Sequence, residues 1–118
     1  MAPDVAEVEL AIIGSGSGNS LLTPYWDGRP VAIAESGVFG GTCLNVGCIP
    51  TKMFVRPAQL ARTHEEAARV GVQLPVGTAD FAAIRDRIFG RIDPISAGGL
   101  DYRQQSEHVT VLGEVTLA

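Results

Sequence analysis

Short apolar runs along the chain predict strands. Residues 7–13, "EVELAII", alternate at first and then run apolar, which is typical of a strand whose later part is buried on both faces. A second run, "VAIA" at residues 31–34, predicts another short strand. Near the carboxyl end, "HVTVLGEVTLA" at residues 108–118 predicts two short strands around Gly113.

Two longer segments have apolar positions at helical spacing. The first covers residues 51–70, and Gly71 is a signal for its end. Pro57 lies inside this segment and is expected to kink the helix or divide it in two, because proline removes a backbone donor. The second segment covers residues 81–93, and Asp80 in front of it is a suitable N-cap.

The second helical segment carries a one-sided apolar stripe. Its members are Phe81, Ile84, Ile88 and Ile92. A stripe of this kind usually buries against a sheet, so we expect it to belong to the core. The arginines of the segment form the solvated side in this interpretation: Arg85, Arg87 and Arg91. Pro94 and the Gly98–Gly99 pair are expected to kink and loosen the chain that follows.

Composition limits the classes of function. The chain of 118 residues is 46% hydrophobic and 19% charged, enough to bury one core. Nine basic and 13 acidic residues give a net charge of −4, with no basic cluster to follow a phosphate backbone, so we expect no nucleic-acid partner. No apolar run approaches the roughly 20 residues of a membrane span. We therefore expect a cytoplasmic protein without a membrane partner.

A glycine-rich turn, "GSGSGNS" at residues 14–20, follows the first predicted strand. Gly14 and Gly16 occupy the first two positions of the dinucleotide fingerprint, where glycine permits a tight turn and a close approach of the backbone to a pyrophosphate. Asn19 stands at the third position, which normally holds the glycine or alanine that lets helix pack on strand. Pro24 predicts that the following helix is unusually short.

An acidic residue closes the second predicted strand. Glu35 lies 21 residues beyond Gly14, the spacing at which a carboxylate accepts hydrogen bonds from an adenosine ribose. An ordinary strand-to-helix turn is the alternative interpretation of the glycines alone. The order of strand, glycine turn, short helix, strand and acid favours dinucleotide binding, and either NAD or FAD fits these residues.

The chain has two cysteines, Cys43 and Cys48, five positions apart. Five residues of regular helix rise about 7.5 Å, beyond the roughly 7 Å between Cα atoms that a disulfide tolerates. Pro50 suits the first turn of a helix that begins near Cys48, so we expect Cys43 on an irregular segment folded back against that helix. A thiolate at a helix N-terminus is favoured by the helix dipole, and Lys52 lies one turn along.

Metal binding is the alternative use of a close cysteine pair. Two ligands are too few for a closed tetrahedral zinc site. The two histidines, His64 and His108, lie far along the chain without metal-ligand spacing. A reducing compartment disfavours an idle structural disulfide, so the pair is interpreted as a redox couple and no metal is expected.

The stretch "GGTCLNVGCIPTK" at residues 40–52, preceded by the glycine turn and the acidic strand end, resembles the flavoprotein disulfide reductases, which are class I pyridine nucleotide-disulfide oxidoreductases. This family includes lipoamide dehydrogenases, glutathione reductases, mercuric reductases and mycothione reductases. Within it, "GSGSGNS", "IPTKMFV" and "IRDRIFGRIDPISAGG" are most similar to the mycothione reductases. The resemblance covers nearly all of this chain and the opening portion of the family's longer chain.

The resemblance implies an α/β fold, namely part of a Rossmann-like FAD-binding domain with a doubly wound parallel sheet and a β-rich end. Residues 1–118 would form the amino-terminal part of that domain, without the nicotinamide-binding and dimerisation domains. FAD would be the cofactor, and NADPH would supply hydride in the complete enzyme, a homodimer. The substrate would be a low-molecular-weight disulfide similar to mycothione.

The resemblance also implies roles for individual residues. The backbone around Gly14, Gly16, Ser17 and Gly18 would hold the FAD pyrophosphate, and Gly41 and Thr42 would also contact the FAD. Glu35 would hold the adenosine ribose, and Lys52 would lie close to the reactive nitrogen of the flavin. Cys48 would be the thiol facing the flavin, whereas Cys43 would attack the disulfide substrate.

Two alternatives stay open at this point. One keeps the enzyme class but changes the substrate to lipoamide or another disulfide, because substrate contacts in such folds come largely from elsewhere. The other is a truncated flavin- or nucleotide-binding module without catalysis. The chain alone would lack a hydride-donor site and a proton-transfer group, so we expect its turnover to be negligible.

Overall fold

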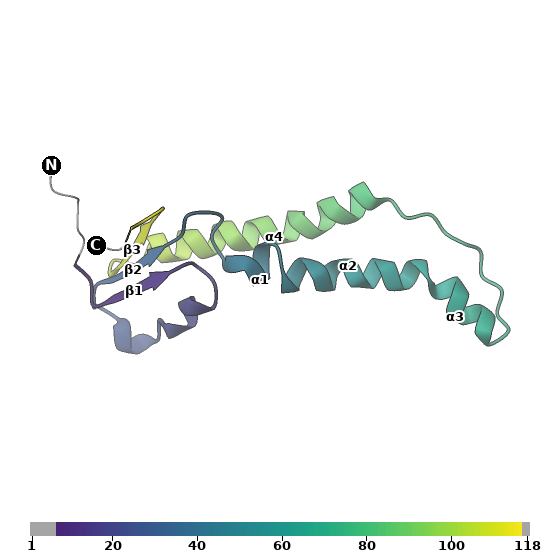
Figure 1. Cartoon of the computed structure of the whole chain (residues 1–118), viewed down its shortest axis with the longest axis horizontal. Helices are drawn as coiled ribbons and strands as arrows, with labels where there is room; N and C mark the ends of the chain where they lie inside the picture. Colours follow the sequence, from purple (N-terminus) through teal and green to yellow (C-terminus); the bar gives the residue numbers. More distant parts are fainter. Residues whose placement is uncertain (1–6, 117–118) are drawn as a thin grey trace.

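A computed structural model describes residues 7–116, and its centre is a three-stranded parallel sheet (Figure 1). The strands are β1 (Leu10–Ile13), β2 (Val31–Ala34) and β3 (Val109–Leu112), in the order β1-β2-β3. Both pairs are parallel and in register, so that Leu10 is opposite Val31 and Val31 is opposite Val109. The arrangement confirms the α/β fold that the sequence predicts.

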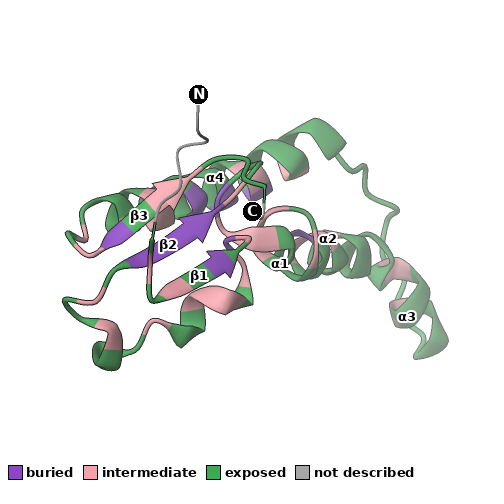
Figure 2. Ribbon diagram, turned by 60° about the vertical axis from the view of Figure 1, so that its left-hand side comes forward, coloured by how far each residue is buried: buried purple, intermediate pink, exposed green. Residues whose placement is uncertain are grey.

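The central strand β2 is buried along its whole length, as its uninterrupted apolar run predicts (Figure 2). Strand β1 differs from its prediction, because Ile12 is buried whereas Ile13 has 65% of its surface exposed. Two-sided burial was therefore the wrong expectation for the end of β1. Ala11 and Ile13 are both exposed and point to the same face of the sheet, so that face of β1 is uncovered among the described residues.

The connection from β1 to β2 contains two short 3₁₀ helices instead of an α-helix. They are η1 (Ser17–Leu21) and η2 (Pro24–Trp26). The short helix predicted from Pro24 is confirmed, because this proline begins a new turn and its fixed φ suits that place. Trp26 packs against the cluster of buried side chains that covers the sheet.

A set of helices follows β2: α1 (Gly41–Asn45), α2 (Cys48–Ala61) and α3 (Thr63–Arg69). Pro57 lies inside α2 without ending it, and the division predicted for this segment occurs at Arg62 instead. Division at Pro57 was therefore the wrong expectation, whereas the alternative of a kink at Pro57 stays a prediction. The end signal predicted at Gly71 is confirmed, because α3 ends just before it, at Arg69. Gly71 has a φ of +84°, and its amide donates to the Ala68 carbonyl.

Helix α4 (Phe81–Gln104) returns the chain to the sheet (Figure 1). The predicted cap is confirmed, because the Asp80 side chain accepts a hydrogen bond of 3.0 Å from the Ala83 amide. The helix continues through Pro94, contrary to the expected loosening. Ile92 before the proline and Ser96 after it are both buried, so packing on either side holds the helix despite the missing hydrogen bond.

The apolar stripe of α4 is buried only in part and does not cover the sheet as expected. Ile88 and Ile92 are almost fully buried, whereas Phe81 is 65% exposed. Neither isoleucine belongs to the cluster over the sheet, and it is Leu100, further along α4, that packs against that cluster. The first turns of α4 lie along α2 instead, beyond the edge of the sheet (Figure 1).

The carboxyl end supplies one strand where the pattern predicts two. Strand β3 ends at Leu112, and residues 114–116 have no strand conformation. The remainder of the predicted second strand, residues 117–118, lies outside the described residues. A lone short segment beyond Gly113 has no neighbouring strand to pair with in the described sheet, which explains the difference.

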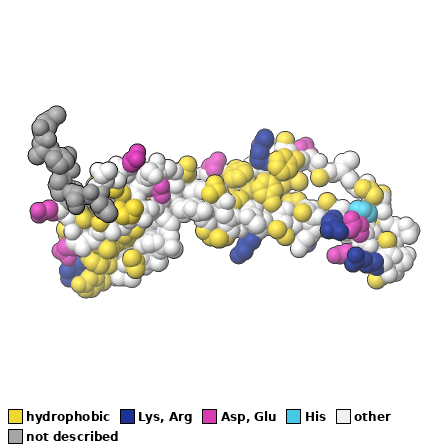
Figure 3. Space-filling view, viewed as in Figure 1, with side chains coloured by type: hydrophobic (Ala, Val, Ile, Leu, Met, Phe, Trp, Pro, Cys, Tyr) yellow, Lys and Arg dark blue, Asp and Glu magenta, His cyan; other side chains and the backbone are white. Residues whose placement is uncertain are grey.

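The chain is elongated, with extents of 72 × 32 × 23 Å and a radius of gyration of 21.1 Å. A compact chain of this length would have a radius of gyration of about 13 Å. The excess comes from the hairpin of α2, α3 and α4, which projects from the sheet (Figure 1). Hydrophobic side chains gather on it (Figure 3). The rings of Phe54 in α2 and Phe81 in α4 stack on each other.

Candidate functional site

The site lies at the carboxyl ends of β1 and β2. There a cavity of about 480 Å³ opens, a size typical of small-molecule sites. Its lining joins the glycine turn, the end of β2 and helix α1: Gly14, Ser15, Gly16, Glu35, Val38, Gly41, Thr42, Asn45 and Val46. Parallel sheets bind ligands at this edge, so the geometry agrees with the position expected for a dinucleotide.

Gly14 makes the turn from β1 into the glycine loop. Its φ of +88° lies in the left-handed region that favours glycine, and its amide donates to the Ala34 carbonyl at 2.7 Å. The first fingerprint position is therefore occupied for the predicted reason. No atom lies within 4 Å of the place where a Cβ would stand, so this side of the turn is open.

Ser15 ties three parts of the site together. Its hydroxyl donates to Glu35 Oε2 at 2.5 Å and accepts from the Gly40 amide at 2.8 Å. The Ser15 amide donates to the same carboxylate oxygen at 3.0 Å. Only 2% of Ser15 is exposed. The side chain thus joins the glycine loop, the end of β2 and the entrance to α1, a role that the sequence analysis missed.

These hydrogen bonds hold Glu35 in its ionised form. The Ser15 hydroxyl is the largest cause that lowers the pKa of Glu35, and the Gly37 amide, which donates to Oε1 at 2.9 Å, adds to it. Since the folded pKa is below the unfolded one, Glu35 stabilises the fold above its unfolded pKa. That contribution is lost as pH falls through the folded pKa.

Ser15→Ala should raise the pKa of Glu35 toward the ordinary value of about 4.3, because the strongest donor to the carboxylate is removed. A carboxyl NMR titration of the two proteins measures the change. Ser20→Ala is the matched control, since the Ser20 hydroxyl donates to the exposed Ser17 carbonyl. Equal Glu35 midpoints in Ser15→Ala and Ser20→Ala would contradict this account of the carboxylate.

The glycine loop and the start of α1 approach each other closely. A Cβ on Gly41 would overlap Gly16 Cα and would stand 3.0 Å from Gly16 N. Gly41 also has a φ of +82°. Both the contact and the dihedral angle therefore require glycine at position 41. The two backbones meet beside the cavity and form one continuous wall of it.

Close packing of the turn on β1 is provided by Gly18. A Cβ on Gly18 would stand 2.8 Å from Ile12 Cγ2, too close for a side chain. The fingerprint assigns close packing to the third position, which Asn19 holds here. Gly18 takes over this packing one position earlier, so the departure at Asn19 leaves the approach of η1 to β1 intact.

The two cysteines form a disulfide between α1 and α2. Their Cα atoms are 4.6 Å apart, and both residues are exposed. Cys48 is the first residue of α2, and Pro50 lies in its first turn, as predicted. Cys43 lies within the short helix α1, which corrects the expected irregular segment. The break at Val46 and Gly47 between the two helices brings the thiols together.

Helix α1 is fixed through one backbone carbonyl in front of it. Asn45 Nδ2 donates to the Phe39 carbonyl at 3.0 Å and to the Gly41 carbonyl at 3.1 Å. The buried Ser96 hydroxyl of α4 donates to the same Phe39 carbonyl. These bonds position the helix that carries Cys43, because five residues alone are too few to form a stable helix.

The structure brings together most of the predicted site residues. Gly14, Gly16, Glu35, Gly41 and Thr42 all line the cavity. Ser17, Gly18 and Lys52 do not line it, and their contact with a cofactor stays a prediction. Asn45 and Val46 line the cavity as well, although no feature of the sequence identified them.

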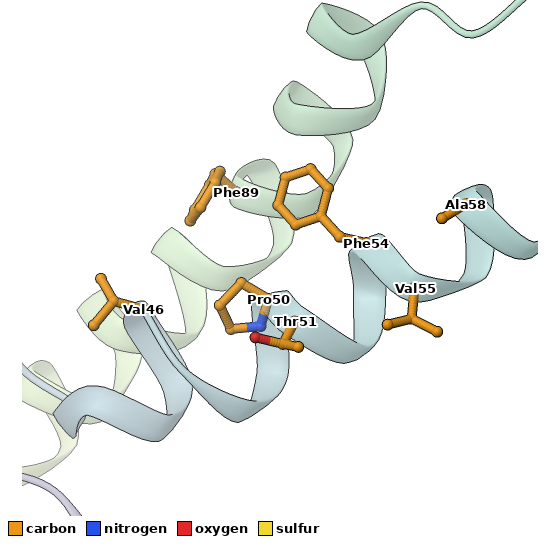
Figure 4. A pocket seen from close by; sticks show the side chains of 7 residues that line it. All are labelled: Val46, Pro50, Thr51, Phe54, Val55, Ala58 and Phe89. Carbon is orange, nitrogen blue, oxygen red and sulfur yellow. The ribbon is translucent and has the colours of Figure 1, made fainter.

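A second, apolar groove begins on the other side of Val46, between α2 and α4 (Figure 4). Figure 4 shows Phe54 and Phe89 facing the groove from the two helices. Pro50, Val55 and Ala58 continue the apolar lining. No charged side chain lines this groove, and Thr51 contributes a polar side chain to its lining. Val46, with 76% of its surface exposed, separates the groove from the cavity at the glycine loop.

Within residues 7–116, no helix is long and apolar enough to cross a membrane. The same part of the chain contains no group of three or more His, Cys, Asp and Glu side chains that could hold a metal ion.

Comparisons with known proteins return one family of enzymes. The chain is 48% identical to mycothione reductase of Mycobacterium tuberculosis over 103 residues. This match covers 87% of this chain and 22% of that enzyme. It is 33% identical over 94 residues to dihydrolipoyl dehydrogenase of Bacillus subtilis, covering 78% of this chain and 20% of that enzyme. Mercuric reductase of Streptomyces lividans is 37% identical over 90 residues, and this match covers 71% of this chain and 19% of that enzyme. No protein-family model matches the chain.

Among solved structures, the chain is similar to the HOCl-induced flavoprotein disulfide reductase RclA from Escherichia coli, determined as a Cu(II) complex. The TM-score is 0.67 at 27% sequence identity, over 88% of this chain and 21% of the other. The chain thus spans about a fifth of the length of the proteins it matches.

Proposed function

The chain belongs to the flavoprotein disulfide reductase family, and from this premise we propose that it is the FAD-binding, disulfide-carrying part of an enzyme that reduces a low-molecular-weight disulfide. One observation carries the proposal. An exposed Cys43–Cys48 disulfide lies on the two helices that flank Val46, which lines a cavity shared with the glycine loop and Glu35. Residues 1–118 are assigned to the amino-terminal part of the FAD domain.

The cavity fits the cofactor at three points. The close contact of Gly41 with Gly16 keeps side chains away from one wall, so a pyrophosphate can approach the backbone. Gly14 leaves open space beside its Cα. Glu35 presents an ionised carboxylate at the end of β2, an acceptor suited to a ribose hydroxyl.

Bound FAD would supply two electrons to the disulfide, after NADPH has provided them as hydride through a domain outside this chain. The chain's own residues then act as thiols. Cys48, at the N-terminus of the 14-residue helix α2, is the better stabilised thiolate and is assigned to the flavin side. Cys43 is assigned to the substrate, because it is exposed on the short helix α1.

Thiol exchange completes the reaction. The Cys43 thiolate attacks one sulfur of the substrate disulfide, which breaks that bond, releases one thiol and leaves a mixed disulfide on Cys43. The Cys48 thiolate then attacks the Cys43 sulfur, releases the second thiol and re-forms the Cys43–Cys48 bond. Two substrate thiols are formed for each protein dithiol oxidised. The exposure of both cysteines allows this attack.

Mycothione is the proposed substrate, since the mycothione reductase relative has 48% identity with this chain. Lipoamide is the second candidate, supported by the dihydrolipoyl dehydrogenase relative at 33%. The complete enzyme is proposed to be a cytoplasmic homodimer. Reduction of mycothione and of lipoamide by the complete enzyme, followed as consumption of NADPH, compares the two. Faster consumption with mycothione supports the proposal, whereas faster consumption with lipoamide contradicts mycothione as the substrate.

Glu35→Ala should weaken FAD binding by about tenfold, because it removes the ribose acceptor and the partner of Ser15 together. Flavin fluorescence quenching gives the dissociation constant. Glu66→Ala is the control, since Glu66 is an exposed acid on α3, distant in sequence from the cavity lining. Equal affinities for the two variants would remove Glu35 from the assigned cofactor site.

A further inference from the structure

Asn19 holds the place of the third fingerprint glycine, and the structure gives it contacts that a glycine could not make. Its side-chain nitrogen donates to the Ser15 carbonyl at 2.7 Å and to the Gly16 carbonyl at 3.2 Å. Both acceptors belong to the glycine loop that lines the cavity. The side chain therefore reaches back across the turn and fixes two of its peptide groups.

A residue 84 positions away orients this amide. Arg103, in the last turn of α4, donates from Nε to Asn19 Oδ1 at 3.1 Å and from Nη2 to the Asn19 carbonyl at 3.3 Å. A guanidinium has only donors, so it has to face the oxygen of the amide. The amide nitrogen is then turned toward the loop carbonyls, which are acceptors only. Arg103 thus selects the amide orientation that the glycine loop needs.

The other contacts of Arg103 do not explain its position. It makes no ion pair among residues 7–116. Its guanidinium lies 5.2 Å from the ring centre of Tyr102, but Tyr102 is 66% exposed, where such a contact contributes little. The two hydrogen bonds to Asn19 are the interactions that bring this half-buried cation to the loop.

Helix α4 also contacts the segment in front of α1. Ser96 precedes Arg103 by seven residues, two helical turns, and therefore lies on nearly the same face. Its hydroxyl donates to the Phe39 carbonyl in front of α1. One face of α4 thus holds the glycine loop through Asn19 and the disulfide helix through Phe39.

We propose that Arg103 is a positioning residue for FAD, which acts through Asn19 to hold the glycine loop in the shape that receives the pyrophosphate. This inference rests on the proposed function, because it assumes that the cavity binds FAD. The Arg103–Asn19 pair adds a long-range clamp on the glycine loop, while Gly18 supplies the close packing that the fingerprint assigns to the third position.

The test is the FAD dissociation constant of the chain, measured by flavin fluorescence quenching. Arg103→Ala should raise it about tenfold, the size expected for losing a hydrogen bond to a charged group. Arg103→Lys should recover part of the affinity. Arg91→Ala, on the exposed side of the same helix, is the matched control and should leave the constant unchanged.

A double-mutant cycle separates positioning from general stability. In an Asn19→Ala background, Arg103→Ala should change FAD affinity less than it does in the parent chain, because the bond from Nε to the amide is already missing and only the bond from Nη2 to the carbonyl of residue 19 remains. Far-UV circular dichroism checks that each variant is folded, and Arg103→Gln replaces the alanine variant if helix signal is lost.

The outcomes distinguish the two proposals. If the parent chain binds FAD and the folded Arg103 variants bind equally well, the role of Arg103 is overturned and the proposed function stands. Additive losses in the cycle would likewise overturn action through Asn19. If the parent chain binds no FAD, the proposed function is overturned, and this inference with it.

Discussion

Cys48→Ser should abolish the long-wavelength absorbance band that a thiolate beside oxidised flavin produces in the reduced, FAD-loaded chain. Cys48 is the first residue of α2, where the helix dipole favours a thiolate, and Lys52 adds a positive charge one turn along. A serine hydroxyl stays protonated and cannot donate charge in this way. The band at wavelengths above the flavin absorption is measured after anaerobic reduction with a dithiol.

Cys43→Ser is the matched control for this prediction. It removes the disulfide as well, but it leaves Cys48 free as a thiolate at the helix terminus. The band should therefore be kept or strengthened, even without a dithiol. Loss of the band in Cys43→Ser and its retention in Cys48→Ser would mean that the two roles are reversed.

Among the glycines of this chain, Gly41→Ala should lower the free energy of unfolding and the FAD affinity the most, because its Cβ would make the shortest contact. The new Cβ would overlap Gly16 Cα, and the φ of +82° disfavours any side chain. Strain and overpacking together should lower the free energy of unfolding by about 2–4 kcal/mol. FAD affinity should fall by more than about tenfold, because the two backbones that wall the cavity are pushed apart.

Gly90→Ala provides the comparison for Gly41→Ala. Gly90 lies inside α4, no atom lies within 4 Å of its missing Cβ, and alanine is the better helix former. This variant should be stabilised by about 0.5–1 kcal/mol and should bind FAD as the parent does. Urea unfolding and flavin fluorescence measure both effects. Equal responses of the two variants would contradict the close contact at Gly41.

The local parts of the site could be predicted from the sequence. Gly14 is the residue after β1, and Glu35 is the residue after β2. Each strand has four residues, so the positions of Gly14 and Glu35 at the carboxyl edge of the sheet depend on short stretches of chain. Pro50 after the glycine at position 47 predicts that a helix begins near Cys48, and α2 does begin there. The α/β fold class was implied by the family resemblance, and the strands and helices predicted from the local pattern agree with it.

The long-range parts could not be predicted. Ser15 contacts Glu35 across 20 positions, and Arg103 contacts Asn19 across 84, so neither pair has a sequence signature. Helix α1 has only five residues and depends on Asn45 and Ser96, which meet at the Phe39 carbonyl. Proline disfavours the interior of a helix, yet α4 continues past Pro94 because tertiary packing stabilises it on both sides.

The measurement that tests the central claim most directly is the visible absorbance spectrum of the purified chain, mixed with FAD, desalted, and then reduced with a dithiol. The account predicts retained flavin absorbance and a new long-wavelength band once Cys43 and Cys48 are reduced, because the cavity and the disulfide adjoin at Val46. A colourless protein after desalting, or bound flavin without a band on reduction, would contradict the assignment of the two cysteines to a flavin-linked redox couple.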